Sequence, residues 1–506
     1  MEETKNNLQE KFISFLSENS NFILIVILIF ALILRIKYLT INQAVWYDEA
    51  EYLASAKAWA FGTPYELHFV RPVLLPFIFA IFYKFGASEL FLRVIILVFS
   101  LVGILLTYLV GKELVGNTVA LIATFMLSSS YVHVFYTARL LTDIPSLTLW
   151  LISIWFFWKG YVKNENKIYF WWFGLFFILA VLMKFPAGLL GIIIILYLLL
   201  SEGLNFIKNR NLWIAGLIMV IIFIPYGFWY YFTYNKIPII GVAGFYHSVN
   251  YLNVYLTQTI PMILISPIPV LSGIFPSFGN FLIIFLIVGS ILLLFNLLLG
   301  YNLVRKNEEL KRHLFILFWL FIPIIYFSFL AGQVPEDRYL FYSYPATFYL
   351  IGFVFVKIYK RFKKINTLSG VISAIILFVI ITSIAIQNLQ TADNLIKLKS
   401  NSYIQFRQSG TWIKENSFPE QKVIATGVPQ LSYYSERKII YWPEKKEFER
   451  LLKEDKDVRY LVLSVLEGSP QWTYVWPQEN QDKVVPVQAY LDQQQRPILI
   501  VYEVIR

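Results

Sequence analysis

The sequence contains no cysteine, and charged residues make up only 15% of its 506 residues. The absence of cysteine excludes disulfide bonds and thiolate chemistry. Hydrophobic residues account for 58% of the chain and aromatic residues for 18%. This balance is too apolar for a soluble protein of such length and indicates a polytopic membrane protein.

The charges that are present are mainly basic, with a net charge of +11. In a membrane protein this excess reflects lysines and arginines of cytoplasmic loops, so we expect no nucleic-acid partner. Residues 1–21 are polar, and no small-residue cleavage site follows the first apolar run. We therefore expect that run to be a retained helix and not a cleaved signal.

Apolar runs close to the ~20 residues that cross a bilayer recur along the chain. Residues 71–86 are also apolar, but Pro72, Pro76 and Lys84 favour a half-buried interfacial helix there. Together the longer runs predict about eleven transmembrane helices, at 22–39, 90–110, 115–132, 137–158, 168–183, 187–203, 211–233, 279–303, 313–331, 338–357 and 368–387.

Basic residues lie in alternate loops between these runs, which is the positive-inside pattern of a chain with a cytoplasmic N-terminus. The outer side then receives a first external loop at 40–89, the residues 234–278 and the residues 333–338. With an odd number of helices, the chain after Gln387 is outside as well. The predicted location is the cell membrane, with several spans and an extracytoplasmic tail.

The chain changes character near residue 390. Short apolar runs alternate there with helix-like stretches, which predicts a small α/β domain with a partly parallel sheet. The tail carries no glycine-rich nucleotide fingerprint, and we expect a packing or acceptor-shaping role. The predicted domains are 1–389 and 390–506. The expected strands are 423–425, 438–441, 460–464 and 498–502, and the expected helices are 403–415 and 446–453.

Three carboxylates in four residues follow the first apolar run: Asp48, Glu49 and Glu51. Acidic groups so close to hydrocarbon are costly unless they face water, a partner or a substrate. Catalysis at the membrane surface would account for them, and an ordinary solvated loop is the alternative.

Other polar residues gather on the same predicted side. Cations next to carboxylates beside a lipid phase suit a phosphate head group held by Arg or Lys while a carboxylate takes a proton. These residues are His68, Arg71, His133, Tyr136, Arg139, Thr142, Asp143, Lys184, Glu336, Asp337, Arg338 and Tyr339.

Simpler explanations exist for several of these residues. Arg139 and Asp143 are spaced to pair along one helix, and the alternative role of Arg338 is that of a helix-end anchor that snorkels to the interface. His133 and His247 are more often plain hydrogen-bonding residues than metal ligands. Lys184 is harder to explain in this way, because a lysine within the membrane requires an anion.

Four motifs resemble a known group of proteins. They are Tyr-Asp-Glu-Ala-Glu-Tyr at 47–52, Arg-Pro at 71–72, Tyr-Thr-Ala-Arg-Leu-Leu-Thr-Asp-Ile-Pro at 136–145, and Glu-Asp-Arg-Tyr at 336–339 followed by Tyr-Pro at 344–345. Over about residues 20–390 the chain resembles the GT-C glycosyltransferases, in the branch of protein O-mannosyltransferases and lipid A aminoarabinose transferases. The implied fold is a polytopic α-helical membrane protein with a small C-terminal extracytoplasmic α/β domain.

The resemblance implies an inverting transfer of a sugar from a polyprenyl-phosphate carrier, of dolichyl or undecaprenyl type, to a lipid, glycan or protein acceptor. Asp48 matches the catalytic acid/base position, and we count Glu49 beside it as a candidate. Asp143 matches a second family carboxylate.

The donor phosphate needs cationic ligands. Arg71 matches the family's basic residue before proline and is the first candidate, and Arg338 with Tyr339 occupies the later Arg-Tyr motif. Arg139 and Lys184 complete the candidate set. Some relatives hold a divalent cation through a carboxylate next to the Arg-Pro pair, where this chain has Val70. We assign no cofactor or metal, and Asp143 with His247 is the remaining candidate pair.

Two other classes of function compete with this reading. A transporter or flippase of lipid-linked saccharides usually shows repeated halves and helices broken at the midplane, and the sequence shows neither. A non-catalytic receptor with an external domain would not require the acidic motif at 48–51.

Overall fold

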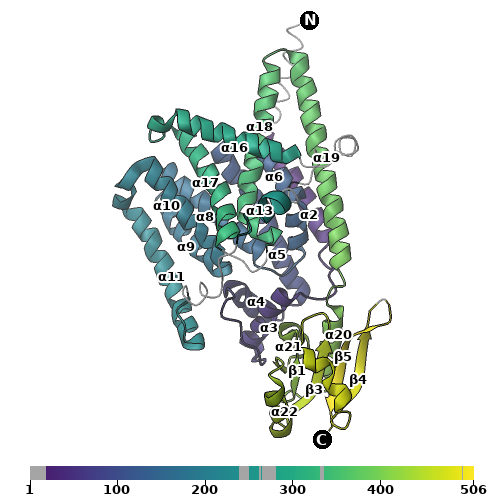
Figure 1. Cartoon of the computed structure of the whole chain (residues 1–506). Coiled ribbons are helices and arrows are strands. Elements are labelled where there is room, and N and C mark those ends of the chain that lie inside the picture. The colour runs from purple at the N-terminus through teal and green to yellow at the C-terminus, as the bar shows by residue number, and fades with distance from the viewer. Residues whose placement is uncertain are drawn as a thin grey trace. The chain divides into compact units, whose positions relative to one another are not determined.

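The computed structural model describes residues 19–238, 250–260, 264, 281–330, 335–492 and 494–505. These residues form many helices and one small sheet (Figure 1). They divide into two compact units. The first comprises the described residues of Met1–Tyr38, Val94–Ala138 and Thr142–Leu395. The second comprises those of Leu39–Arg93, Arg139–Leu141 and Ile396–Arg506.

The first unit is helical. Its α-helices are α2 (Ser20–Lys37), α5 (Glu89–Val115, beginning in the second unit), α6 (Asn117–Ser129), α7 (Tyr131–Thr137), α8 (Asp143–Phe157), α9 (Ile168–Met183), α10 (Leu189–Glu202), α11 (Arg210–Tyr234), α13 (Leu252–Val254), α16 (Phe281–Leu299), α17 (Glu308–Phe329), α18 (Tyr344–Lys363) and α19 (Thr367–Lys399). Short 3₁₀ or π segments are η1 (Trp158–Val162), η2 (Phe185–Gly188), η3 (Gly203–Lys208), η4 (Tyr255–Thr259), η6 (Tyr301–Leu303) and η7 (Asp337–Ser343).

Within the described ranges, eight helices are long and apolar enough to cross a membrane, and the pair α6–α7, bent by 55°, makes a ninth if it counts as one span. Helices α8 and α9 cover the two remaining predicted spans with 15 and 16 residues. The prediction of a polytopic helical membrane protein is therefore confirmed. The predicted loop at 234–278 and the residue Gln333 lie largely or wholly outside the described residues.

Helix α19 extends beyond the predicted span. It continues to Lys399, whereas the predicted span ends at Gln387 and the predicted tail begins near residue 390. The segment after Gln387 is polar but contains neither glycine nor proline, and Gln, Ala, Leu and Lys are good helix formers. The helix therefore continues where the hydropathy falls.

Buried aromatic residues hold η7 and α18 in place inside the first unit. The ring of Trp150 in α8 lies 4.0 Å from that of Tyr342, centroid to centroid. The Tyr342 hydroxyl lies 2.6 Å from the Ser146 hydroxyl, and the indole N–H of Trp319 in α17 donates to the Tyr342 carbonyl at 2.5 Å. Aromatic packing with satisfied polar ends fixes orientation as well as contact area, so the Arg338–Tyr339 segment has a defined position.

The second unit contains the sheet, in the order β2-β1-β3-β5-β4. Strands β1, β2 and β3 are parallel, and β5 pairs antiparallel with both β3 and β4. The predicted partly parallel sheet is therefore found. Strand β4 was not predicted, because Pro486 interrupts its pattern; proline is tolerated on an edge strand such as this one. The strands are β1 (Lys422–Ala425), β2 (Lys438–Ile440), β3 (Val458–Ser464), β4 (Val484–Leu491) and β5 (Pro497–Val504).

Each face of the sheet has its own hydrophobic core. On one face Phe406 and Leu431 pack with Val423, and on the other Phe448 and Trp476 pack with Ile424. The alternation of neighbouring strand residues between the two cores follows the strand period of two. The helical segments are α20 (Ile404–Glu415), α21 (Val428–Ser435), α22 (Lys445–Glu454), η8 (Gln471–Tyr474) and α23 (Trp476–Glu479), of which α21, η8 and α23 were not predicted.

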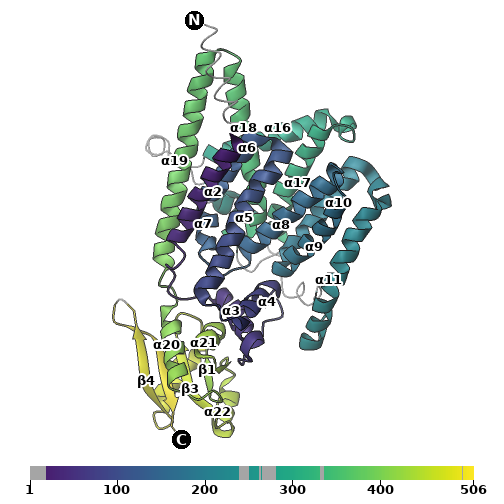
Figure 2. The same cartoon turned by 180° about the vertical axis from the view of Figure 1, so that it is seen from behind.

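Helices α3 (Tyr47–Phe61) and α4 (Leu74–Lys84) of the loop at 40–89 also belong to the second unit, where they pack side by side (Figure 2). The acidic motif thus begins a helix. Asp48 and Glu49 lie in its first turn, where the helix dipole favours negative charge. Helix α3 ends at Gly62, whose φ of +76° is the left-handed conformation that glycine adopts readily. The division into domains 1–389 and 390–506 groups these residues differently and stays a prediction.

Candidate functional site

Two clusters of charged residues contain most of the candidates. The first, here the acidic cluster, consists of Asp48, Glu51 and Arg71 in the second unit. The Arg71 Nη2 donates to Asp48 Oδ1 at 2.6 Å, and its Nε forms an ion pair with Glu51. The Asp48 side chain is 22% exposed and that of Glu51 only 5%. Asp48 is therefore the carboxylate of this cluster that a substrate reaches more easily.

Electrostatics within the acidic cluster distinguish its members. Burial raises the pKa of Glu51, the positive charge of Arg71 opposes this, and the charge of Asp48 adds to it. Tyr65 is hydrogen-bonded to Glu51 as well. Burial lowers the pKa of Arg71, but the nearby carboxylates outweigh it and raise that pKa well above its ordinary value. Arg71 therefore stays charged and is engaged by two carboxylates at once.

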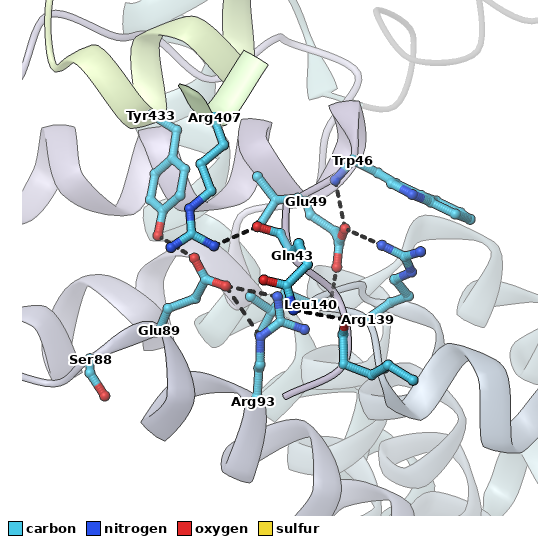
Figure 3. A network of polar contacts seen from close by, with 12 residues as sticks. Gln43, Trp46, Glu49, Ser88, Glu89, Arg93, Arg139, Leu140, Arg407 and Tyr433 are labelled. Atoms are coloured by element: carbon cyan, nitrogen blue, oxygen red, sulfur yellow. Dashed lines mark hydrogen bonds and ion pairs between the residues drawn. The ribbon is translucent and has the colours of Figure 1, made fainter. Parts of the chain in front are cut away.

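Glu49 has a different environment from its neighbours in the motif (Figure 3). It is fully buried. Its carboxylate accepts hydrogen bonds from the backbone N–H of Trp46 at 2.7 Å and of Leu140 at 2.6 Å, and Arg139 Nη1 lies 3.5 Å away. The Arg139 guanidinium lies over the Trp46 ring, 3.8 Å from its centroid, and donates to the Lys399 carbonyl at 3.2 Å. Glu49 and Arg139 thus join residues 139–141 to the start of α3.

The second cluster, here the basic cluster, consists of Asp143, Lys184 and Arg338 in the first unit. Lys184 Nζ lies 2.5 Å from Asp143 Oδ1, and Arg338 Nη1 lies 3.9 Å from Oδ2. Asp143 is buried, with 2% of its side chain exposed. Arg338 also pairs through Nε with Glu336 at 2.6 Å. Two cations of different segments therefore meet at one buried carboxylate.

Local sequence explains how these cations are placed. Lys184 has an extended backbone, with φ −161° and ψ 118°, between α9 and η2. Helix α9 cannot continue through Pro186, because proline has no backbone N–H to donate and its ring would clash with the carbonyl four residues earlier. The Tyr339 ring stacks on Phe327 with centroids 5.4 Å apart, and Lys184 Nζ lies 5.2 Å from the Tyr339 centroid.

Asp337 belongs to the polar residues that the sequence places on one predicted side of the membrane, and no role was predicted for it. In the structure its carboxylate accepts hydrogen bonds from the hydroxyls of Tyr136 at 3.0 Å and Tyr131 at 3.3 Å. The Tyr344 hydroxyl donates to the Asp337 carbonyl at 2.8 Å. Tyrosines from the motifs at 136–145 and 336–345 therefore hold η7 in place. The recurrence of tyrosine next to acidic residues in these motifs was the sequence signal that could have indicated this role of Asp337.

His133 is a hydrogen-bonding residue in this structure. Its Nδ1 lies 2.8 Å from Arg35 Nη2, and both side chains are buried. Because a guanidinium only donates, Nδ1 must be the acceptor. Within the described ranges, no three His, Asp or Glu residues form a group that could hold a metal ion. His247 lies outside those ranges, so its pairing with Asp143 stays a prediction and no step is assigned to a metal.

A protein-family model described as dolichyl-phosphate-mannose-protein mannosyltransferase matches residues 70–229. A protein from Aquifex aeolicus (strain VF5), described only as uncharacterized, is 26% identical over 335 residues. That match covers 64% of this chain and 62% of the relative, so the chain spans less than two thirds of the relative's length.

Among solved structures, ArnT from Cupriavidus metallidurans bound to undecaprenyl phosphate is similar with a TM-score of 0.65 and 14% identity, covering 94% of this chain and 97% of ArnT. An oligosaccharyltransferase from Archaeoglobus fulgidus tethered to an acceptor peptide gives a TM-score of 0.59 and 13% identity, covering 96% and 74%. AglB of the same organism, in complex with an inhibitory peptide and a dolichol-phosphate, gives a TM-score of 0.58 and 12% identity, and the match covers 88% of this chain and 69% of AglB. The fold that the four motifs indicated is thereby confirmed.

Proposed function

We propose that this chain, which has the fold of the GT-C membrane glycosyltransferases, transfers a sugar from a polyprenyl-phosphate carrier to an acceptor hydroxyl. The observation that carries the proposal is Asp48, a partly exposed carboxylate fixed by Arg71 at the start of a short helix in a membrane protein. The similarity to ArnT bound to undecaprenyl phosphate and to AglB with dolichol-phosphate supports a lipid-phosphate donor.

In this proposal Asp48 is the general base. It accepts the proton of the acceptor hydroxyl as that oxygen attacks the anomeric carbon C1 of the sugar. The bond between C1 and the phosphate oxygen breaks, and the lipid phosphate leaves with the bonding electron pair, which inverts C1. Arg71 restrains Asp48 through its 2.6 Å hydrogen bond, and orientation of this kind is a major source of rate acceleration.

The leaving phosphate requires positive charge more than it requires a proton. We assign this role to Lys184 and Arg338, with Asp143 holding the two cations together. The sequence prediction placed Arg71 first among the phosphate ligands. Because its guanidinium already holds Asp48 and Glu51, we assign it to the base instead.

Glu49 and Arg139 receive positioning roles in this account, in place of the catalytic and donor-binding roles expected from the sequence. Both are buried, and Glu49 is occupied by two backbone N–H groups. Their bonds fix the first turn of α3, which carries Asp48. Glu49 is acting as the N3 residue of a capping arrangement.

The proposed reaction takes place on the extracytoplasmic face, and its acceptor is a lipid, a glycan or a protein. The cytoplasmic N-terminus and external tail rest on the positive-inside pattern of the loops. Membrane lipids surround the spans, and no nucleic acid takes part.

Incubating the purified protein in detergent with a radiolabelled polyprenyl-phosphate sugar tests the proposal. A transferase releases free lipid phosphate and moves the label to an acceptor or to water. A transporter reconstituted in vesicles would move the labelled lipid across the bilayer and leave its sugar–phosphate bond intact. Movement without bond cleavage would overturn the proposed function in favour of transport.

A further inference from the structure

Arg35 is a buried cation in α2, one of the helices long and apolar enough to cross a membrane. Among the described residues its guanidinium finds hydrogen-bond acceptors but no carboxylate. Ionisable groups inside membrane helices are expensive, and they commonly mark functional positions. Arg35 has no part in the chemistry proposed above, so its presence requires another reason.

The guanidinium of Arg35 lies at the break between α6 and α7. Its Nη1 donates at 2.9 Å to the carbonyl of Ser128, in the last turn of α6. Carbonyls there have no partner within the helix, and the helix dipole favours a positive charge beside them. Across the break, the backbone N–H of Tyr131 donates to the Asn388 side chain at 3.1 Å. Both sides of the 55° bend are therefore satisfied, as a break inside a membrane requires.

Arg35 also holds α7 itself, and α2 packs against both α6 and α7 (Figure 2). Arg35 Nη2 lies 2.8 Å from His133 Nδ1 in α7, and its Nε donates to the Ser100 hydroxyl of α5 at 2.9 Å. The hydroxyl of Thr137, the last residue of α7, lies 3.1 Å from that of Ser100. Helix α7 has only seven residues, which is too short for a stable helix on its own. Its orientation therefore depends on these contacts.

The orientation of α7 in turn determines where η7 lies. Two tyrosines of α7, Tyr131 and Tyr136, donate hydrogen bonds to the Asp337 carboxylate at 3.3 Å and 3.0 Å. The Tyr136 ring also meets Phe341 edge-on, with the centroids 5.7 Å apart. Polar groups removed from water need such partners, so η7 follows any movement of α7.

We propose that Arg35 is a positioning residue of the donor-phosphate site, which fixes the place of Arg338 through α7 and Asp337. Arg338 follows Asp337 directly in the chain, and its Nη1 lies 3.9 Å from Asp143 Oδ2 in the basic cluster. The inference rests on the proposed function, in which Arg338 is a ligand of the phosphate. A misplacement of about 1 Å can cost a catalytic site a hundredfold in rate, so a contact that merely orients α7 affects the donor.

The test measures the affinity of the full-length protein in detergent for undecaprenyl phosphate, and its release of lipid phosphate from an undecaprenyl-phosphate sugar. Arg35→Gln removes the charge and most of the contacts, and the dissociation constant should rise by roughly three- to thirtyfold. The Michaelis constant for the acceptor should change less. Arg35→Lys keeps the charge and should recover part of the affinity. Thr137→Val removes only the link to Ser100; it should fold even if Arg35→Gln does not, and should weaken binding in the same direction.

The variant Arg338→Gln distinguishes positioning from general stability. If Arg35 acts through Arg338, adding Arg35→Gln to Arg338→Gln should weaken binding by less than about twofold further. Tyr349→Phe is the matched control, because it removes a buried hydrogen bond of 2.6 Å to the Thr107 carbonyl, and this bond involves neither α7 nor η7. The control should lower the melting temperature and leave the affinity for undecaprenyl phosphate unchanged.

Two results would overturn the inference and leave the proposed function intact. One is a wild-type dissociation constant in folded Arg35→Gln and Thr137→Val proteins. The other is an effect of Arg35→Gln that is as large in the Arg338→Gln protein as in the wild type. A wild-type protein that binds undecaprenyl phosphate but releases none from the sugar donor would instead overturn the proposed function.

Discussion

Replacing Lys184 with methionine should weaken use of the lipid-phosphate donor. Methionine keeps an unbranched chain of similar length and removes the charge that lies 2.5 Å from Asp143. Arg338, at 3.9 Å, is too distant to replace this contact without moving. A charged hydrogen bond contributes about 1.5–3 kcal/mol, so the Michaelis constant for the donor should rise by roughly ten- to a hundredfold.

The single variant also leaves a buried carboxylate without its nearest cation, because only 2% of the Asp143 side chain is exposed. Loss of one partner of a buried pair is strongly destabilising. The double variant Lys184→Met/Asp143→Asn removes both charges and should restore much of the thermal stability. It should not restore donor use, since the phosphate has still lost a cation.

The assay measures the Michaelis constant for a polyprenyl-phosphate sugar, inhibition by the free polyprenyl phosphate, and the melting temperature in detergent. Lys184→Arg serves as the charge-preserving control and should retain most donor affinity. A stable double variant with wild-type values for both the donor and the inhibitor would refute the assignment of Lys184 to the phosphate.

Further predictions concern the acidic cluster, the tail and the topology. Arg71→Ala should lower kcat more than it raises the donor Michaelis constant, with Arg71→Lys intermediate; a change confined to the donor constant would restore Arg71 as a phosphate ligand. Burial raises the pKa of Glu436, but hydrogen bonds from Lys414 and Lys57 outweigh it, and the pKa falls below its ordinary 4.5. The ion pairs of Glu436 therefore stabilise the folded protein above pH 4.5, and this stabilisation is lost as the pH falls through the lowered pKa of Glu436 in the folded state. The melting temperatures of the wild type and of Glu436→Gln should accordingly converge in acid. A reporter fused after Arg506 should react with impermeant reagent in intact cells, and reaction only after permeabilisation would place the tail inside.

The sequence predicted the membrane helices well because a bilayer demands long apolar runs with internally satisfied backbone. The predicted range 168–183 coincides with α9. Hydropathy did not indicate the C-terminal end of α19, because the residues after Gln387 are polar and the helix nevertheless continues to Lys399. Strand β4 was missed because an edge strand tolerates a proline that would argue against a central strand.

The sequence identified the candidate residues more successfully than it identified their partners. It grouped Arg139 with Asp143 by helical spacing, but the structure pairs Arg139 with Glu49 and Asp143 with Lys184. Such contacts join distant segments and depend on tertiary packing. The burial of Glu49 could not be predicted from the sequence either. Trp46 is not a standard N-cap residue, so the capping pattern at the start of α3 was not recognisable.

The most direct test of the account is the rate of lipid-phosphate release by Asp48→Asn. Asparagine keeps the size of the side chain and a hydrogen-bonding oxygen but cannot accept the acceptor's proton. Loss of a general base should lower the rate by about 10²–10⁴-fold, with protein abundance, melting temperature and the donor Michaelis constant close to those of the wild type. A folded Asp48→Asn protein that releases lipid phosphate at a near wild-type rate would contradict the account.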